Sequence, residues 1–393
     1  MVFFNGPLPM PSVYFDNAAT TPLADEVLAE MLPYLQNVFG NPSSIHAHGR
    51  EARAAIEKAR KKIAELLQTS PSEIFFTSGG TEADNFALAS AIEVHNIRHV
   101  ISSPLEHHAV LHTLEYLQQK GKISLHLLPV DALGQLDLDT LQAWLTQFRP
   151  VLVSLMHGNN EIGNLIDLEA IGGLCREHGA LFHSDTVQTL GHYAHTLQHL
   201  PVDYIVGSAH KFHGPKGVGF IYIRAEQGLK PFIHGGAQER NMRGGTENIY
   251  GIVGMAKALE LAYAEMEKHR RHIEGLKDRF VKGLQAQIPD VQFYGLSADP
   301  SQSLYTVVNV SLPPSDKSDL LLFNLDIHKI SASAGSACSS GSDIGSHVLR
   351  ALGASPKRAA VRFSFSRYNT EAEVDFVLHT LRGLYVPAQV IVE

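Results

Sequence analysis

Short apolar runs alternate with helical patterns through most of the first 260 residues. The run EIFFTS (73–78) predicts a strand and is followed by a predicted helix at 81–92. Further strands are predicted at 99–103, 123–130, 151–156, 180–185, 202–208 and 218–223, with helices at 106–121, 136–145 and 167–179. Strands that alternate with helices predict a mostly parallel sheet with helices on both faces.

An amphipathic helix is predicted at residues 50–67, before this alternation. Its apolar residues recur at 52, 55, 56, 59, 63, 66 and 67, the 3.6-residue period of a helix that faces a core. A long helical segment near 247–285 leads into a region of mixed strands and helices. We therefore predict an α/β fold with a large domain at 13–260 and a smaller α+β domain formed by 1–12 and 261–393.

The composition excludes several classes of protein. The 393 residues are 44% hydrophobic and carry a formal net charge of −8, which gives no reason to expect binding to nucleic acid or to a membrane surface. No apolar run is long enough to span a bilayer, and the N-terminus lacks the pattern of a signal peptide. Two cysteines cannot build a disulfide framework, so we expect a cytoplasmic protein. Cys175 lies in an apolar helical pattern and is predicted to be a core residue.

One candidate binding element is TSGGTEADN, in which two glycines separate a strand from a helix that opens at Thr81. Bare amide groups at a helix N-terminus bind anions, most often phosphate. An ordinary Gly-Gly turn explains the motif equally well. The chain has neither a Walker loop nor a dinucleotide-binding fingerprint.

Two further candidates follow predicted strands. Asp185, in HSDTVQ, needs a cationic partner if it is buried, and either a protonated cofactor ring or a structural arginine would serve. Lys211, in GSAHKFHGPKGVGF, is a candidate Schiff-base amine. The competing Lys216 lies in a predicted loop and is expected to be solvated.

Histidines give a weaker signal, because the chain has 22 of them. His107 follows a strand and opens a helix, where an imidazole could stack on a flat ring or transfer protons. His108 and His112 stand four residues apart, but no further ligand cluster supports a metal site, so no metal is predicted. A phosphate cradle, a buried acid, a lysine and a ring-stacking histidine are together the parts needed to hold pyridoxal 5'-phosphate.

Cys338 lies in SAGSACSSGS, among serines and glycines that offer nothing to bury it. An incidental exposed thiol in a loop is one explanation. A nucleophile that must move between two positions is the other, because small polar residues leave its loop free of the core.

The sequence resembles the cysteine desulfurases, pyridoxal-phosphate enzymes of the aspartate-aminotransferase fold type. The resemblance runs from VYFDNAATTP (13–22) to VRFSFSRYNTEAEVD (361–375). It is carried by FFTSGGTEADN, EHHAV, MHGNNEIG, HSDTVQTLG, SAHKFHGPKGVG, GGAQERNMRGGTEN, SAGSACSSGS and VLRALG, in the family's order.

The resemblance implies roles at the matching positions. Lys211 would hold the cofactor as a Schiff base, His107 would stack on its ring, and Asp185 would pair with the pyridinium nitrogen. Gln188 and Asn160 would also contact the cofactor. The phosphate would be held by Gly80, Thr81, Ser208, His210 and, from the neighbouring subunit of a homodimer, Thr246. Arg362 would grip the substrate carboxylate with its planar fork, unless it is a surface strand residue.

The resemblance also implies a reaction. L-cysteine would give L-alanine, while Cys338 would take the sulfur as a persulfide and pass it to an iron–sulfur scaffold or another acceptor protein. A selenocysteine lyase, an aminotransferase and a non-catalytic protein with the same fold are alternatives. Asn241 stands where the family commonly has a small residue, so the local turn is expected to differ. The tail after residue 385 is shorter than in some relatives, which leaves the acceptor open.

Overall fold

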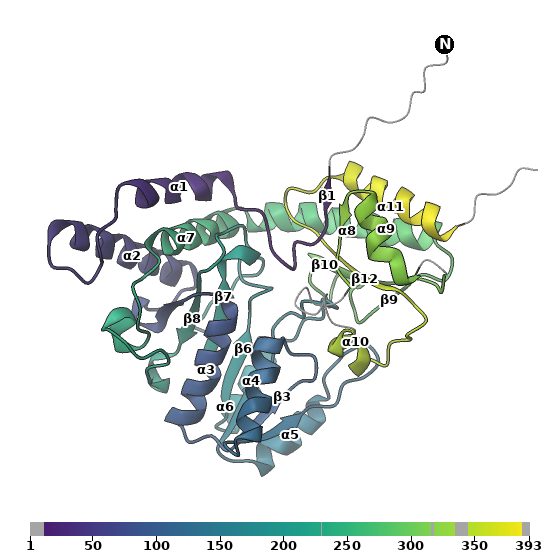
Figure 1. The fold of residues 1–393 in the computed structure, drawn as a ribbon. Coiled ribbons are helices and arrows are strands. Elements are labelled where there is room, and N and C mark those ends of the chain that lie inside the picture. The colour runs from purple at the N-terminus through teal and green to yellow at the C-terminus, as the bar shows by residue number, and fades with distance from the viewer. Residues whose placement is uncertain (1–11, 229, 316–317, 335–344, 387–393) are drawn as a thin grey trace, which may run out of the picture. The chain divides into compact units, whose positions relative to one another are not determined.

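The computed structural model describes residues 12–228, 230–315, 318–334 and 345–386 (Figure 1). They fall into two compact units. The larger unit takes Thr20–Asn160 and Asn164–Lys268. The smaller unit takes the described residues of Met1–Ala19, Glu161–Gly163 and His269–Glu393. The chain therefore changes unit at residue 269 and also places three residues after Asn160 in the smaller unit.

A seven-stranded sheet with the order β2-β8-β7-β6-β5-β3-β4 forms the centre of the larger unit. Its strands are β2 (Ile74–Thr77), β3 (His99–Ser102), β4 (Ser124–Leu127), β5 (Val151–Ser154), β6 (Leu181–Asp185), β7 (Tyr204–Ser208) and β8 (Gly219–Ile223). Strands β7, β6, β5, β3 and β4 run parallel, and β8 runs antiparallel to β7 and to β2. The prediction of a mostly parallel sheet is confirmed.

Helices cover both faces of this sheet. They are α1 (Asp25–Gln36), α2 (Ala47–Leu66), α3 (Gly80–Val94), α4 (His108–Gln119), α5 (Leu138–Gln147), α6 (Leu168–Glu177) and α7 (Ile249–Ala264). Alternate residues of β5 show the two faces, because Val151 and Val153 pack with α2, α5, α6 and α7, whereas Leu152 packs with α3 and α4. Cys175 is buried in the first of these clusters, as predicted. Among the described residues, no helix has both the length and the apolar character needed to cross a membrane.

The smaller unit contains a parallel pair, β1 (Val13–Tyr14) with β11 (Ile330–Ser331), and a three-stranded antiparallel sheet. That sheet has the order β12-β10-β9, with β9 (Gln292–Phe293), β10 (Val307–Ser311) and β12 (Ala360–Ser364). The helices are α8 (Met266–Gln287), whose first three residues belong to the larger unit, α9 (Leu321–Ile327), α10 (His347–Ala351) and α11 (Glu371–Tyr385). Edge-to-face contacts among Phe15, Phe280, Phe363 and Phe365 form part of its core.

Two helical regions, which together form α1, α7 and α8, differ from the sequence prediction. The segment 247–285 is not one helix, because Glu265, with ψ 17°, separates α7 from α8. Helix α7 is buried along most of its length and packs against α1 and α2 (Figure 1), whereas α8 has a polar face. Helix α1 was not predicted, and it contains Pro33, a residue that disfavours helix interiors.

Candidate active site

The larger unit collects most of the predicted site residues at one edge of its sheet. Strand β2 runs in the same direction as β7, since both are antiparallel to β8. The ends of β2, β3, β5, β6 and β7 therefore lie at the same edge, where open α/β sheets bind ligands. The predicted site residues at these strand ends and in the segments after them are Gly80, Thr81, His107, Asn160, Asp185, Gln188, Ser208, His210 and Lys211.

The turn of Gly79 and Gly80, called here the glycine cradle, connects β2 to α3. Gly79 is the N-cap of α3 with φ +155°, and no side chain caps that helix end. A Cβ on Gly80 would lie 2.8 Å from Val187 Cγ2, so the position accepts only glycine without a shift of its neighbour. A Cβ on Gly219 would lie 2.8 Å from the Gly79 Cα. The absence of a side chain at Gly219, in β8, therefore allows the backbone of the turn to approach that strand closely. Ser208, which is buried, lies beside Gly80.

His210 and Lys211 follow β7 in a short turn. The pKa of His210 is lowered to about 4 by burial, and further by the charges of Lys211 and Lys216, so the ring is neutral at pH 7. Its Nδ1 lies 3.1 Å from the Thr20 hydroxyl. Lys211 is partly buried, whereas Lys216 is exposed, as predicted.

Asp185 is buried at the end of β6, and its carboxylate accepts a hydrogen bond of 2.8 Å from the Val187 amide. Burial raises the pKa of Asp185 to about 6, although the Val187 amide and the charge of Lys211 act in the opposite direction. No arginine among the described residues contributes to this balance. The alternative of a structural arginine pair therefore finds no support, and the site can accept a cationic ring nitrogen.

Two further buried acids surround Asp185, and the sequence reasoning missed both. The pKa of Asp84 is raised well above its usual value by burial, and then by the charges of Asp185 and Glu106. Asp84 Oδ1 lies 3.4 Å from His183 Nε2, and burial lowers the pKa of His183 to about 3, so this imidazole is neutral at pH 7. Carboxylate oxygens of Asp84 and Asp185 and a ring nitrogen of His107 lie within 4.8 Å of one another. The sequence feature that could have identified them is their position inside two motifs, TEADN for Asp84 and EHHAV for Glu106.

His107 is held by its backbone and its ring. It is the N-cap of α4, and its Nδ1 accepts a hydrogen bond of 3.2 Å from the Ala109 amide, which leaves the proton of the neutral ring on Nε2. The adjacent Glu106 is buried and accepts a 2.8 Å hydrogen bond from the Met156 amide, at the end of β5. The segment that carries His107 is thereby fixed to the segment that carries the buried Asn160.

Gln188 and Thr246 lie in different surroundings. Gln188 is buried in the turn after β6, which is closed by a 2.8 Å hydrogen bond from the Leu190 amide to the Thr186 carbonyl. Thr246 is exposed in the loop before α7 and does not follow a strand of the sheet.

The smaller unit carries the two remaining candidates. Arg362 is 1% exposed, so the alternative of a surface residue is wrong, and its Nη2 donates a 2.8 Å hydrogen bond to Asp16 Oδ1. Cys338 lies outside the described residues. The nearest described segments on either side of it are fixed, since Ser333 exchanges two backbone hydrogen bonds with Arg362. On the other side, the Ser346 hydroxyl donates to the buried Glu161.

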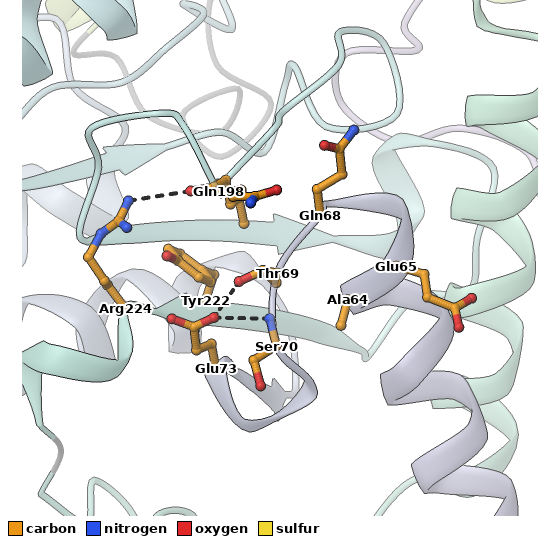
Figure 2. A pocket seen from close by; sticks show the side chains of 10 residues that line it. Ala64, Glu65, Gln68, Thr69, Ser70, Glu73, Gln198, Tyr222 and Arg224 are labelled. Carbon is orange, nitrogen blue, oxygen red and sulfur yellow. Dashed lines mark hydrogen bonds between the residues drawn. The ribbon is translucent and has the colours of Figure 1, made fainter.

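A polar pocket of about 470 Å³ opens at the opposite edge of the sheet, where β2 begins and β8 ends (Figure 2). Its polar groups bind one another, because Glu73 accepts hydrogen bonds from the Thr69 hydroxyl and the Ser70 amide (Figure 2). Arg224 donates to the backbone carbonyls of Leu197 and Leu200. This pocket contains none of the predicted site residues, and we assign it a structural role.

Buried histidines make the larger unit sensitive to acid. His157 Nδ1 lies 3.2 Å from His195 Nε2, and burial lowers the pKa of His195 to about 4. Because the pKa of this histidine is lower in the folded state, its contribution to the free energy of unfolding is fully present above the unfolded pKa near 6.5. This contribution is lost as the pH falls toward 4, since only the unfolded state then binds the proton. From pH 7 to pH 5, His195 alone should lower the free energy of unfolding by about 2 kcal/mol. Urea unfolding of the wild type and His195→Asn at both pH values checks this, and an equal pH dependence in both proteins contradicts it.

Comparisons with known proteins identify the family and the fold. Residues 13–377 match the family model described as "Aminotransferase class-V". The "Cysteine desulfurase IscS" of Dictyoglomus turgidum is 43% identical over 95% of this chain and 94% of its own. A solved "NIFS-LIKE PROTEIN" is 40% identical, with a TM-score of 0.86 over 95% of this chain and 98% of its own. The structure "SspA in complex with cysteine" is 32% identical, with a TM-score of 0.77 over 91% and 100% of the two chains. The chain therefore belongs to the class-V aminotransferase family, in which the relatives named here include cysteine desulfurases.

Proposed function

We propose that the protein is a pyridoxal-phosphate-dependent cysteine desulfurase that converts L-cysteine into L-alanine and leaves the sulfur on Cys338. The observation that carries this proposal is the buried carboxylate of Asp185 at the strand ends, which interacts with the charge of Lys211. The similarity to a protein named "Cysteine desulfurase IscS" supports the choice of reaction. The structure titled "SspA in complex with cysteine" supports the choice of substrate.

The residues of the larger unit fit the cofactor. Asp185, whose pKa is about 6 and which has no arginine partner among the described residues, would pair with the pyridinium nitrogen. The uncapped start of α3 and Ser208 would hold the phosphate, to which the neutral His210 can donate from Nε2. Lys211 would hold the cofactor covalently through its amine. Pyridoxal phosphate, when bound, withdraws electrons from the substrate carbons and so weakens the bond to sulfur.

The remaining residues act on the substrate. Arg362 would bind the substrate carboxylate, and Asp16 already fixes the direction of its guanidinium. The released amine of Lys211 would take the proton from the substrate Cα. His107 Nε2 would donate or accept protons near the substrate, since its Nδ1 is occupied by the Ala109 amide.

The sulfur step balances without an external oxidant. The Cys338 thiolate attacks the substrate sulfur, a sulfur–sulfur bond forms, and the carbon–sulfur bond breaks. The electron pair of the broken bond stays with the substrate Cβ, which takes up a proton to become the alanine methyl group. A reducing compartment such as the cytoplasm suits this chemistry, because Cys338 must begin as a free thiol.

A homodimer is part of the proposal. Thr246 is exposed, so it is available to a cofactor phosphate in a neighbouring subunit. Helix α1 exposes Leu28, Leu32 and Leu35, which share one face of the helix, and this apolar stripe suits an interface with a second copy. An iron–sulfur scaffold or another sulfur carrier would then receive the persulfide.

The direct test is incubation of the purified protein with pyridoxal phosphate and L-cysteine. We expect alanine to appear, and mass spectrometry of the peptide that contains Cys338 to show one added sulfur atom. Alanine without added sulfur would indicate a different lyase, and a 2-oxo acid as the product would indicate an aminotransferase.

A further inference from the structure

The loop of residues 232–246, called here the Thr246 loop, has a strained backbone. Glu239, Arg240 and Asn241 have φ angles of 42°, 57° and 67°. Left-handed angles are unfavourable for residues with a Cβ, and successive ones persist only where the surroundings hold them.

A buried ion pair holds the first of these residues. Arg60 of α2 donates hydrogen bonds of 2.8 Å from Nη1 and Nη2 to the two carboxylate oxygens of Glu239. The side chains of Arg60 and Glu239 are 3% and 2% exposed. A paired fork in this geometry fixes both the position and the direction of the carboxylate.

The same two side chains form hydrogen bonds with backbone groups at the open edge of strand β2. The Phe76 amide donates a 2.8 Å hydrogen bond to Glu239 Oε2, and Arg60 Nη1 donates one of 2.8 Å to the Ile74 carbonyl. Since β2 is at the end of the sheet order, no other strand of the described residues pairs with these backbone groups. Glu239 is thus bonded directly to the strand that leads into the glycine cradle.

A second ion pair connects the Thr246 loop to the cradle itself. Arg243 donates from Nε and Nη2 to Glu82, at 2.8 Å and 3.0 Å. Glu82 lies in the first turn of α3 and also accepts a 2.8 Å hydrogen bond from the Ser78 amide. The base of the loop is closed by a 2.8 Å hydrogen bond from the Gly244 amide to the Ile233 carbonyl.

We propose that Glu239 is a positioning residue which, paired with Arg60, holds the strained turn so that Thr246 reaches the cofactor phosphate in the neighbouring subunit. This inference rests on the proposed function, because it requires the cofactor and the homodimer. Arg243 extends the arrangement, since it ties the turn to the cradle that holds the subunit's own phosphate.

The first test measures cofactor affinity by equilibrium dialysis with pyridoxal phosphate. Glu239→Gln keeps the shape of the side chain but removes its charge, and it should weaken cofactor binding roughly tenfold or more. Asn241→Gly should bind at least as well as the wild type. In the Glu239→Gln background it should restore part of the affinity, because glycine adopts the left-handed angle without strain. Unchanged affinity in Glu239→Gln, or no restoration by glycine, overturns the proposal.

A mixed dimer shows in which subunit Glu239 acts. When Lys211→Ala and Glu239→Gln are in the same chain, the wild-type partner has the only site able to hold the cofactor covalently, and it receives the altered loop. That site should bind weakly. When the two substitutions are in different chains, the competent site receives an intact loop and should bind normally. The reverse pattern overturns the positioning role but leaves the desulfurase proposal standing, whereas wild-type protein that binds no cofactor overturns both.

If Glu239→Gln does not fold, Arg243→Gln tests the second tie alone. It should weaken cofactor binding in both mixed-dimer arrangements, because Arg243 supports the loop given to the neighbouring site and also contacts Glu82 at the subunit's own cradle. Normal binding in both arrangements contradicts the proposal.

Discussion

Lys211→Ala is expected to lose the covalently held cofactor and, with it, alanine formation from L-cysteine. The lysine amine has two tasks in the proposed reaction, to bind the cofactor and to take the Cα proton. Loss of a general base alone typically costs 10²- to 10⁴-fold, so the rate should fall by at least about 10³-fold. Borohydride reduction followed by denaturation should leave the cofactor on the wild-type chain and not on the variant.

Lys216→Ala is the matched control, because Lys216 is exposed and lies five residues further along the same segment. This variant should keep the cofactor and nearly all of its activity. If borohydride labelled residue 216, or if Lys211→Ala retained the label, the assignment of the cofactor lysine would be wrong.

Cys338→Ser is expected to separate cofactor binding from sulfur transfer. A hydroxyl cannot store a sulfur atom as a persulfide, so sulfur delivery should fall by several orders of magnitude while the visible absorbance of the bound cofactor stays. Mass spectrometry after incubation with L-cysteine should find no added sulfur on the variant chain.

Cys175→Ala provides the comparison for this variant. Cys175 is 1% exposed, and burial raises its pKa to about 12, so its thiol does not ionise at neutral pH. The Cys175→Ala variant should still form the persulfide on Cys338, although it should be somewhat less stable because a buried side chain is shortened. Full sulfur transfer by Cys338→Ser would remove the thiol from the mechanism.

The sequence predicted the layers of the larger unit well, because apolar runs and helical periods alternate along it. It did not predict the direction of β8, since GFIYI is apolar at most positions and its pattern carries no sign of direction. Helix α1 was missed, and it contains Pro33. The break at Glu265 was missed because the helical pattern continues across it.

From the residues alone, most of the candidate side chains were predicted because they follow a strand, whereas Thr246 and Arg362 were named only from the resemblance. Asp185 and Lys211 have that position. Asp84 and Glu106 are as deeply buried, but a carboxylate beside a helix start usually faces water, so sequence alone gives no sign of burial. The left-handed turn at Glu239 was not predictable either, because Glu239 and Arg240 both have a Cβ.

Glu239 and Arg60 also have a consequence for the behaviour of the protein in solution. They occupy the free hydrogen-bonding groups of β2, which would otherwise offer a template for strand addition by another molecule. If these two side chains lose their hydrogen bonds to β2, the edge of this strand becomes exposed and prone to aggregation while most of the fold is still intact. During slow heating, variants of Glu239 or Arg60 should therefore become turbid at a lower temperature than the one at which they lose the circular-dichroism signal of their helices.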